Sequence, residues 1–191
     1  MVNNMNEINV AHGMIFQKLK LSMSTYEDKI ITMKKMYLLK SLGTDLNHTF
    51  LWYVRGPFSE TLADYLGDNF DMLHHYDFSQ YKLADEAEKN IKRVNGLLDD
   101  KKQGIRDEQW YEILASLLYI SNANSNQSWR FDGKEESLFE TFMKCRPQYN
   151  QEICQQAYNT LCTRGFIENY KSMDKPKEPN LIKQLKNEHR S

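Results

Sequence analysis

Apolar residues recur at helical spacing along much of the chain. In residues 26–42 they occupy two faces, one with Ile30, Met33 and Tyr37 and the other with Ile31, Leu38 and Leu42. This pattern predicts a helix that packs against other elements on both sides. Gly43 follows directly, and glycine can adopt the left-handed conformation that often ends a helix.

The same spacing predicts helices in other parts of the chain. They cover residues 83–98, a segment that begins near Asp107, a short segment from Leu138 that ends before Pro147, and residues 147–164. A further short helix is expected up to Leu66, because the Ser59 hydroxyl can accept a backbone N–H of its first turn. Helices therefore dominate the expected fold.

Two short runs have the character of strands. Residues 50–54 are aromatic and β-branched and stop at Gly56-Pro57, whereas residues 166–170 alternate between apolar and polar positions. Residues 121–128 offer almost nothing apolar, which indicates a surface loop or a linker. We therefore expect a helical N-terminal lobe (1–120) with an aromatic strand and a Gly-Pro turn, a winged-helix-like C-terminal lobe (129–170) and a charged tail (171–191).

The composition agrees with a compact, mainly α (α+β) domain that has short strands. The chain has 191 residues, of which 40% are hydrophobic and 27% charged, so it can bury a core without a metal or a disulfide. The net charge of -1 provides no long-range field toward nucleic acid or an anionic membrane. Any binding of that kind requires a local patch.

The cysteines and the N-terminal sequence indicate a cytoplasmic protein. Cys145, Cys154 and Cys162 are an odd number, which suits free thiols in a reducing compartment better than a disulfide framework. The first residues lack a basic start and an apolar run, and no stretch approaches the ~20 apolar residues of a membrane helix. Neither export nor membrane insertion is expected.

Several motifs resemble the Panacea antitoxin domain and related uncharacterised bacterial proteins. Residues 35–39 (KMYLL) are followed by residues 52–59 (WYVRGPFS), as a K-x-x-Y-L/F helix in that group is followed by an aromatic strand and a G-P-F/Y-S turn. Residues 110–120 and 138–167, with 146–149 (RPQY) and 164–167 (RGFI), are similar to the C-terminal half of some relatives. The resemblance implies a compact helical fold with winged-helix-like elements, a role in toxin neutralisation or regulation, and no established catalytic residues.

The Gly-Pro-Phe-Ser motif allows a structural and a functional interpretation. It can serve as a strand-to-helix turn with a packed phenyl ring and a helix cap. Alternatively, Trp52, Arg55 and Phe58 frame a groove for a protein partner, since aromatic residues and arginine dominate binding hot spots.

The helix expected over residues 147–164, followed by Gly165-Phe166-Ile167, has the helix-then-wing order of proteins that place a helix in the DNA major groove. Its polar face carries side chains that can read base edges: Gln151, Gln155, Gln156, Asn159 and Thr163. That face has no lysine or arginine, so phosphate contacts depend on flanking cations such as Lys175. Duplex DNA and a protein therefore remain equal alternatives as partners.

One cluster has the chemistry of metal ligands, namely Asp68, Asp71, His74, His75 and Asp77. A metal site needs three or four converging ligands, and adjacent histidines usually point apart, so a surface turn is the simpler interpretation. Among the cysteines, Cys154 and Cys162 share an apolar helix face and are expected to be buried. Only Cys145 has neighbours, Lys144 and Arg146, that could lower the pKa of its thiol.

The sequence thus favours a non-enzymatic regulatory or antitoxin-like interaction module that binds a protein partner or DNA. No catalytic residues, metal ligands or cofactors are assigned to it, and its oligomeric state stays open. The alternative from another class is a metal-dependent enzyme that uses the cluster between Asp68 and Asp77.

Overall fold

The fold is mainly helical with one two-stranded sheet, which confirms the predicted class. A computed structural model describes residues 7–44, 46–125 and 138–167. Its helices are α1 (Glu7–Lys18), α2 (Tyr26–Ser41), α3 (Glu60–Asp68), α4 (Phe70–His75), α5 (Asp85–Asn95), α6 (Asp107–Ser125), α7 (Leu138–Cys145) and α8 (Gln151–Thr163), with a 3-10 turn at Gly96–Leu98. The strands are β1 (Leu51–Tyr53) and β2 (Gly56–Phe58).

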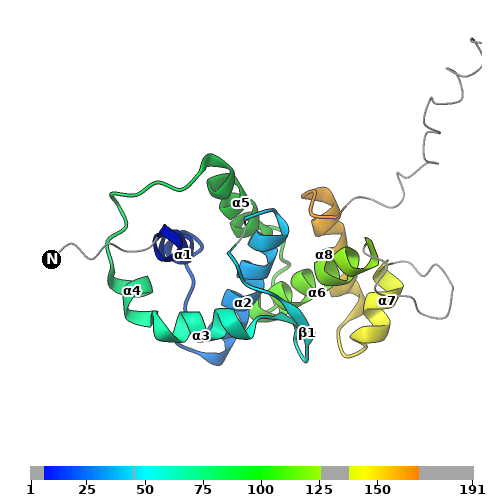
Figure 1. Ribbon diagram of the computed structural model, residues 1–191. Helices are drawn as coiled ribbons and strands as arrows, with labels where there is room; N and C mark the ends of the chain where they lie inside the picture. Colours follow the sequence, from blue (N-terminus) through cyan, green and yellow to red (C-terminus); the bar gives the residue numbers. More distant parts are fainter. Residues whose placement is uncertain (1–6, 45, 126–137, 168–191) are drawn as a thin grey trace, which may run out of the picture.

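Helices α2 and α6 pack against each other at the centre of the fold. In Figure 1, α1, α3 and α4 lie on one side of α2, and α7 and α8 lie on the far side of α6. The start of α2 is fixed by a capping box, in which the Thr25 side chain accepts from the Asp28 N–H and the Asp28 side chain accepts from the Thr25 N–H. Both faces of α2 are buried, as its two apolar faces predict.

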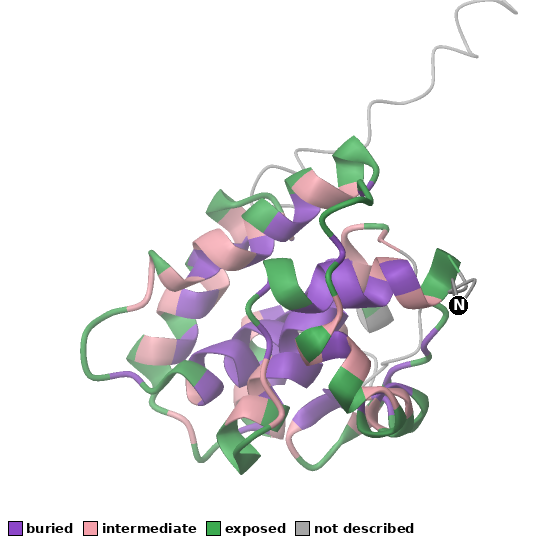
Figure 2. Ribbon diagram, turned by 90° about the vertical axis from the view of Figure 1, so that its left-hand side faces the viewer, coloured by how far each residue is buried: buried purple, intermediate pink, exposed green. Residues whose placement is uncertain are grey.

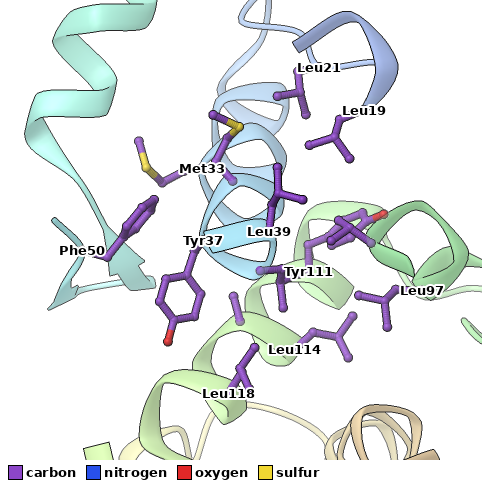
Figure 3. Close-up of a cluster of buried hydrophobic side chains, with 14 of the residues drawn as sticks. Leu19, Leu21, Met33, Tyr37, Leu39, Phe50, Leu97, Tyr111, Leu114 and Leu118 are labelled. Atoms are coloured by element: carbon purple, nitrogen blue, oxygen red, sulfur yellow. The ribbon is translucent and has the colours of Figure 1, made fainter. Parts of the chain in front are cut away.

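The hydrophobic core is one cluster that draws on most of the described helices. Figure 3 shows Met33, Tyr37 and Leu39 of α2 among side chains from α6 and from the segment after α1. Trp110 and Tyr111 of α6 are fully buried, and the Trp110 indole donates to the Leu97 carbonyl over 2.8 Å. In Figure 2, the buried residues lie in the interior of the molecule and the exposed residues on its outside. No helix in the described ranges is long and apolar enough to cross a membrane.

Strands β1 and β2 form a tight antiparallel hairpin that turns at residues 54 and 55. Its register pairs Leu51 with Phe58 and Tyr53 with Gly56. Strand β2 packs on α2 and α6, and Ser59 then caps α3 by accepting from the Leu62 N–H. The expected strand and helix cap are therefore present, although β1 is shorter than the predicted run. The turn expected at Gly56-Pro57 is wrong, because these residues pair with β1 as strand β2 and the chain reverses at residues 54 and 55.

The structure also departs from the expected elements elsewhere. Residues 121–125 continue helix α6, so the prediction of a loop is wrong for them, because the backbone of α6 extends past its last apolar residue. Phe166 and Ile167 form a bend after α8 instead of a strand, and residues 168–170 lie outside the described residues. Helices α1 and α4 had no counterpart in the predicted elements. The division into lobes stays a prediction.

A pair of buried histidines ties α1 to the segment before the hairpin. The Nε2 atoms of His12 and His48 are 3.0 Å apart, and His12 Nδ1 lies 2.8 Å from the Ile8 carbonyl oxygen. A hydrogen bond between two Nε2 atoms needs one protonated and one unprotonated nitrogen, so two charged rings cannot form it. Burial lowers the pKa of His12 below its usual 6.5.

Stability should therefore fall as the pH drops below about 6.5. The His12 pKa is lower in the folded than in the unfolded state, so the unfolded chain binds the proton first as the pH falls. The free energy of unfolding then decreases by up to ~1.4 kcal/mol per pH unit for one proton. Urea unfolding at several pH values measures this slope. His12→Gln should flatten it, whereas His75→Gln, at an exposed position, should leave it unchanged. An equal slope in wild type and His12→Gln would contradict the assignment.

The three cysteines are free thiols in the structure, and Cys154 is buried as predicted, whereas Cys162 is only partly buried. Burial raises the pKa of all three, and that of Cys154 to about 11. The expectation that neighbouring cations could activate Cys145 is not met, because burial outweighs the effect of Arg146 on its pKa.

Native thiol labelling should accordingly be slow at all three cysteines and slowest at Cys154, because a thiolate is the reactive form and burial disfavours it. Mass spectrometry of the labelled peptides at successive times provides the order. In denaturant the three rates should converge. If Cys154 were labelled faster than Cys145 and Cys162 in the native protein, its face of helix α8 would not be part of the core.

Candidate functional site

The hairpin places Arg55 against a buried carboxylate of α6. Glu112 is only 2% exposed, and the Arg55 Nε donates to its Oε2 over 2.6 Å. Glu112 faces the hairpin because the neighbouring positions of α6 are filled by core residues that hold this helix in place. A buried carboxylate needs compensating donors, and Arg55 supplies the first of them.

The connection between α7 and α8 brings two more polar residues to the same place. Tyr149 donates its hydroxyl proton to Glu112 Oε1. Arg146 stacks its guanidinium 4.4 Å from the Trp52 ring centroid, and its Nη2 donates to the Tyr53 carbonyl over 3.1 Å. Residues 52–55 and 146–149 therefore meet in space beside Glu112 of α6.

Helix α2 contributes a buried lysine to this group. Lys34 is 3% exposed, and its Nζ donates to the Pro57 carbonyl over 2.7 Å. Burial lowers its pKa to about 7, an effect that Glu112 opposes and Arg55 reinforces. We refer to Lys34, Arg55, Glu112, Arg146 and Tyr149 as the Glu112 cluster.

The Glu112 cluster carries more positive than negative charge. Arg55 and Arg146 contribute two guanidinium groups, and the Lys34 amine adds a third positive charge below about pH 7, whereas Glu112 is the one carboxylate of the cluster. Burial raises the pKa of Tyr149, so it stays neutral. Arg146 is more than nine-tenths buried, and its Nε has no hydrogen-bond partner among the described residues. The cluster is therefore a locally cationic support beneath the hairpin.

Large apolar side chains cover the outer side of the hairpin. Leu51 is 67% exposed, Tyr53 63% and Val54 75%. Tyr26, at the start of α2, is also exposed, and its ring centroid lies 5.7 Å from the guanidinium carbon of Arg55. We refer to these four residues together with Arg55 as the hairpin surface. Figure 1 shows the hairpin, labelled β1, at the edge of the molecule.

The residues predicted to bind a partner have different roles in the structure. Arg55 belongs to the hairpin surface, with a side chain that is 32% exposed. Trp52 is partly buried between Arg146 and Tyr119, and Phe58 is partly buried with its ring 5.6 Å from that of Tyr53. Sequence reasoning missed Leu51, Tyr53 and Val54, although the alternation of side chains along a strand separates Leu51 and Tyr53 from Trp52.

The polar face of α8 is partly occupied by contacts within the protein. Gln156 donates to the Asp100 carbonyl, and Gln155 donates to Asn159 over 3.1 Å. Arg164 forms a two-point ion pair with Asp100, with both distances 2.8 Å. An open groove of about 700 Å³ runs beside this face and is also lined by Thr163, whereas Gln151 is exposed at the start of the helix. Lys175 lies outside the described residues, and DNA binding stays a prediction.

The cluster between Asp68 and Asp77 does not converge. His74 Nδ1 lies 2.8 Å from the Phe70 carbonyl oxygen, and its ring packs between those of Phe16 and Phe70. Asp77 accepts from the Ser79 N–H in a local turn. Within the parts of the chain that the structure describes, no three histidine, cysteine, aspartate or glutamate side chains are grouped so that they could hold a metal ion.

Comparison with known proteins yields no relative. No family model, no curated protein and no solved structure matches the chain. The resemblance to the Panacea antitoxin domain accordingly stays a prediction.

Proposed function

We propose that the chain is a non-enzymatic, regulatory interaction module that binds a protein partner through the hairpin surface. The observation that carries this proposal is the exposure of Leu51, Tyr53 and Val54, three large apolar residues of one short hairpin. Burial of each such side chain against a partner contributes roughly 1.5–3 kcal/mol before the costs of association. The antitoxin-like role that the resemblance implies is compatible with binding of this kind.

The support beneath the hairpin also favours recognition. Arg55 is held by Glu112 and Arg146 by the Tyr53 carbonyl, so the turn is anchored on both sides. Little conformational freedom is lost when an anchored surface binds, and tyrosine and arginine are the residues most enriched at binding hot spots.

Site-specific photo-crosslinking tests the proposal in extracts of the native host. A photoreactive phenylalanine analogue at position 54 should form a discrete adduct with one partner, and Leu51→Ser with Tyr53→Ser should abolish it. The matched control places the analogue at exposed Lys89 of α5, whose side chain is 68% exposed. The absence of an adduct at position 54, or the same adducts at both positions, would refute the proposal.

Metal analysis of the purified protein tests the alternative function. If the protein contained stoichiometric metal, and Asp71→Ala lost it, the metal-dependent enzyme would be favoured over the interaction module.

A further inference from the structure

We infer that the hairpin surface recognises an acidic, apolar peptide segment, whose carboxylates pair with Arg55 and whose apolar side chains cover Tyr53 and Val54. This inference rests on the proposed function and specifies the chemistry of the partner. Two independent features of the described residues carry it, namely the charge of the Glu112 cluster and the position of Arg55 within the apolar surface.

The first feature is an excess of basic groups. Arg55 pairs with Glu112, Arg146 donates to the Tyr53 carbonyl and Lys34 donates to the Pro57 carbonyl, so three basic side chains reach the hairpin, whereas Glu112 is the one carboxylate of the cluster. Arg146 Nε has no partner among the described residues. Charges in a poorly solvated site act over longer distances than in water, so the cluster creates a positive potential at the hairpin. A partner that brings carboxylates compensates that potential.

The second feature is the availability of Arg55. A guanidinium has five N–H donors in a planar fork. The Nε of Arg55 bonds Glu112, and the Tyr26 side chain is a second hydrogen-bond partner, so donors remain for a further acceptor. The Arg55 side chain is nevertheless 32% exposed. A carboxylate of the partner can bond its outer edge in the geometry that arginine and carboxylates prefer. Such a carboxylate would lie beside Val54, the most exposed apolar residue of the hairpin.

Nucleic acid would also supply negative charge, but the surroundings of Arg55 favour a peptide. The side chains exposed beside Arg55 are those of Leu51, Tyr53 and Val54, which are mainly apolar. A nucleic acid would need lysine or arginine side chains at these positions to contact its phosphates. A peptide with alternating acidic and apolar side chains matches both the positive charge of the cluster and the apolar surface around Arg55. Binding to DNA is therefore an outcome that the experiment must be able to detect.

Selection from a library of random displayed peptides, with the full chain as bait, tests the inference. The selected sequences should be enriched in aspartate and glutamate next to large apolar residues. A synthetic peptide of the consensus sequence should lose at least roughly tenfold in affinity when its carboxylates are replaced by amides. That change lies in the peptide, so it does not depend on whether a protein variant folds. Arg55→Gln should cause a similar loss, and Lys89→Gln should cause none.

Each other outcome overturns the inference. Selected peptides without acidic residues, or an amide peptide that binds equally well, would refute acidic recognition while a crosslink at position 54 still supported the interaction surface. A selection that returns no peptide would refute recognition of a short segment. Competition by a short DNA duplex at equal affinity would assign the positive potential to nucleic acid instead.

Discussion

Glu112→Gln is expected to lower the free energy of unfolding by about 3–5 kcal/mol, the usual cost of removing one partner of a buried ion pair. Glu112 is 2% exposed and accepts from both Arg55 and Tyr149. An amide of the same size retains the packing but removes the single carboxylate among the cations of the Glu112 cluster. Urea unfolding at neutral pH measures the loss.

Two further variants separate charge from packing in this prediction. Glu86→Gln removes a carboxylate from a pair in which both side chains are more than two-thirds exposed, Glu86 and Lys89. Such pairs contribute at most about 1 kcal/mol, so this variant should remain close to wild type. Adding Lys34→Met to Glu112→Gln removes a buried amine that has lost its nearby carboxylate and should restore part of the stability. If the single variant cost no more than Glu86→Gln, Glu112 would not hold the cluster together.

Gly56→Ala is expected to cost about 2–5 kcal/mol, because two penalties act at the same position. The φ angle of Gly56 is +81°, a conformation that residues with a Cβ rarely adopt. A Cβ at this position would also lie 2.2 Å from the Ser116 Oγ of α6. Unfolding in denaturant, together with the loss of hairpin contacts by NMR, would detect the effect.

The two penalties can be measured separately. Ser116 Oγ is buried without a hydrogen-bond partner among the described residues, so Ser116→Ala alone should be nearly neutral. Combined with Gly56→Ala, it should remove the steric part and leave only the cost of the positive φ. Gly67→Ala is the control, because nothing lies within 4 Å of its Cβ position in α3 and helical alanine gains roughly 0.5–1 kcal/mol. Equal effects at positions 56 and 67 would refute the account.

The sequence predicted the parts of the fold that depend on local patterning. Helix α2, the Ser59 cap and strand β1 were expected from apolar spacing, a side-chain oxygen and an aromatic run. Helix α1 was missed because its apolar residues are interrupted by His12 and Gly13. Both interruptions have tertiary causes, since His12 bonds His48 and the Phe78 ring occupies the space where a side chain of Gly13 would lie.

The candidate site was only partly predictable for the same reason. Arg55 was selected because of its residue type, and the structure confirms that it lies at the hairpin. Glu112 and Lys34 are charged residues on helix faces, where solvent exposure is the usual outcome, so no local signal indicated their burial. Their environment arises from segments 57 residues apart for Arg55 and Glu112 and 37 residues apart for Glu112 and Tyr149.

The long-range contacts of the hairpin also determine when it can be completed during synthesis. Tyr53 and Arg146 are 93 residues apart in the chain. Until residues 146–149 have left the ribosome, Arg146 cannot donate to the Tyr53 carbonyl or stack on Trp52. Glu112 likewise has no hydrogen bond from the Tyr149 hydroxyl. The nascent N-terminal part therefore presents an incompletely packed apolar hairpin while the ribosome translates residues 59 to 149, an interval in which chaperones have access to it.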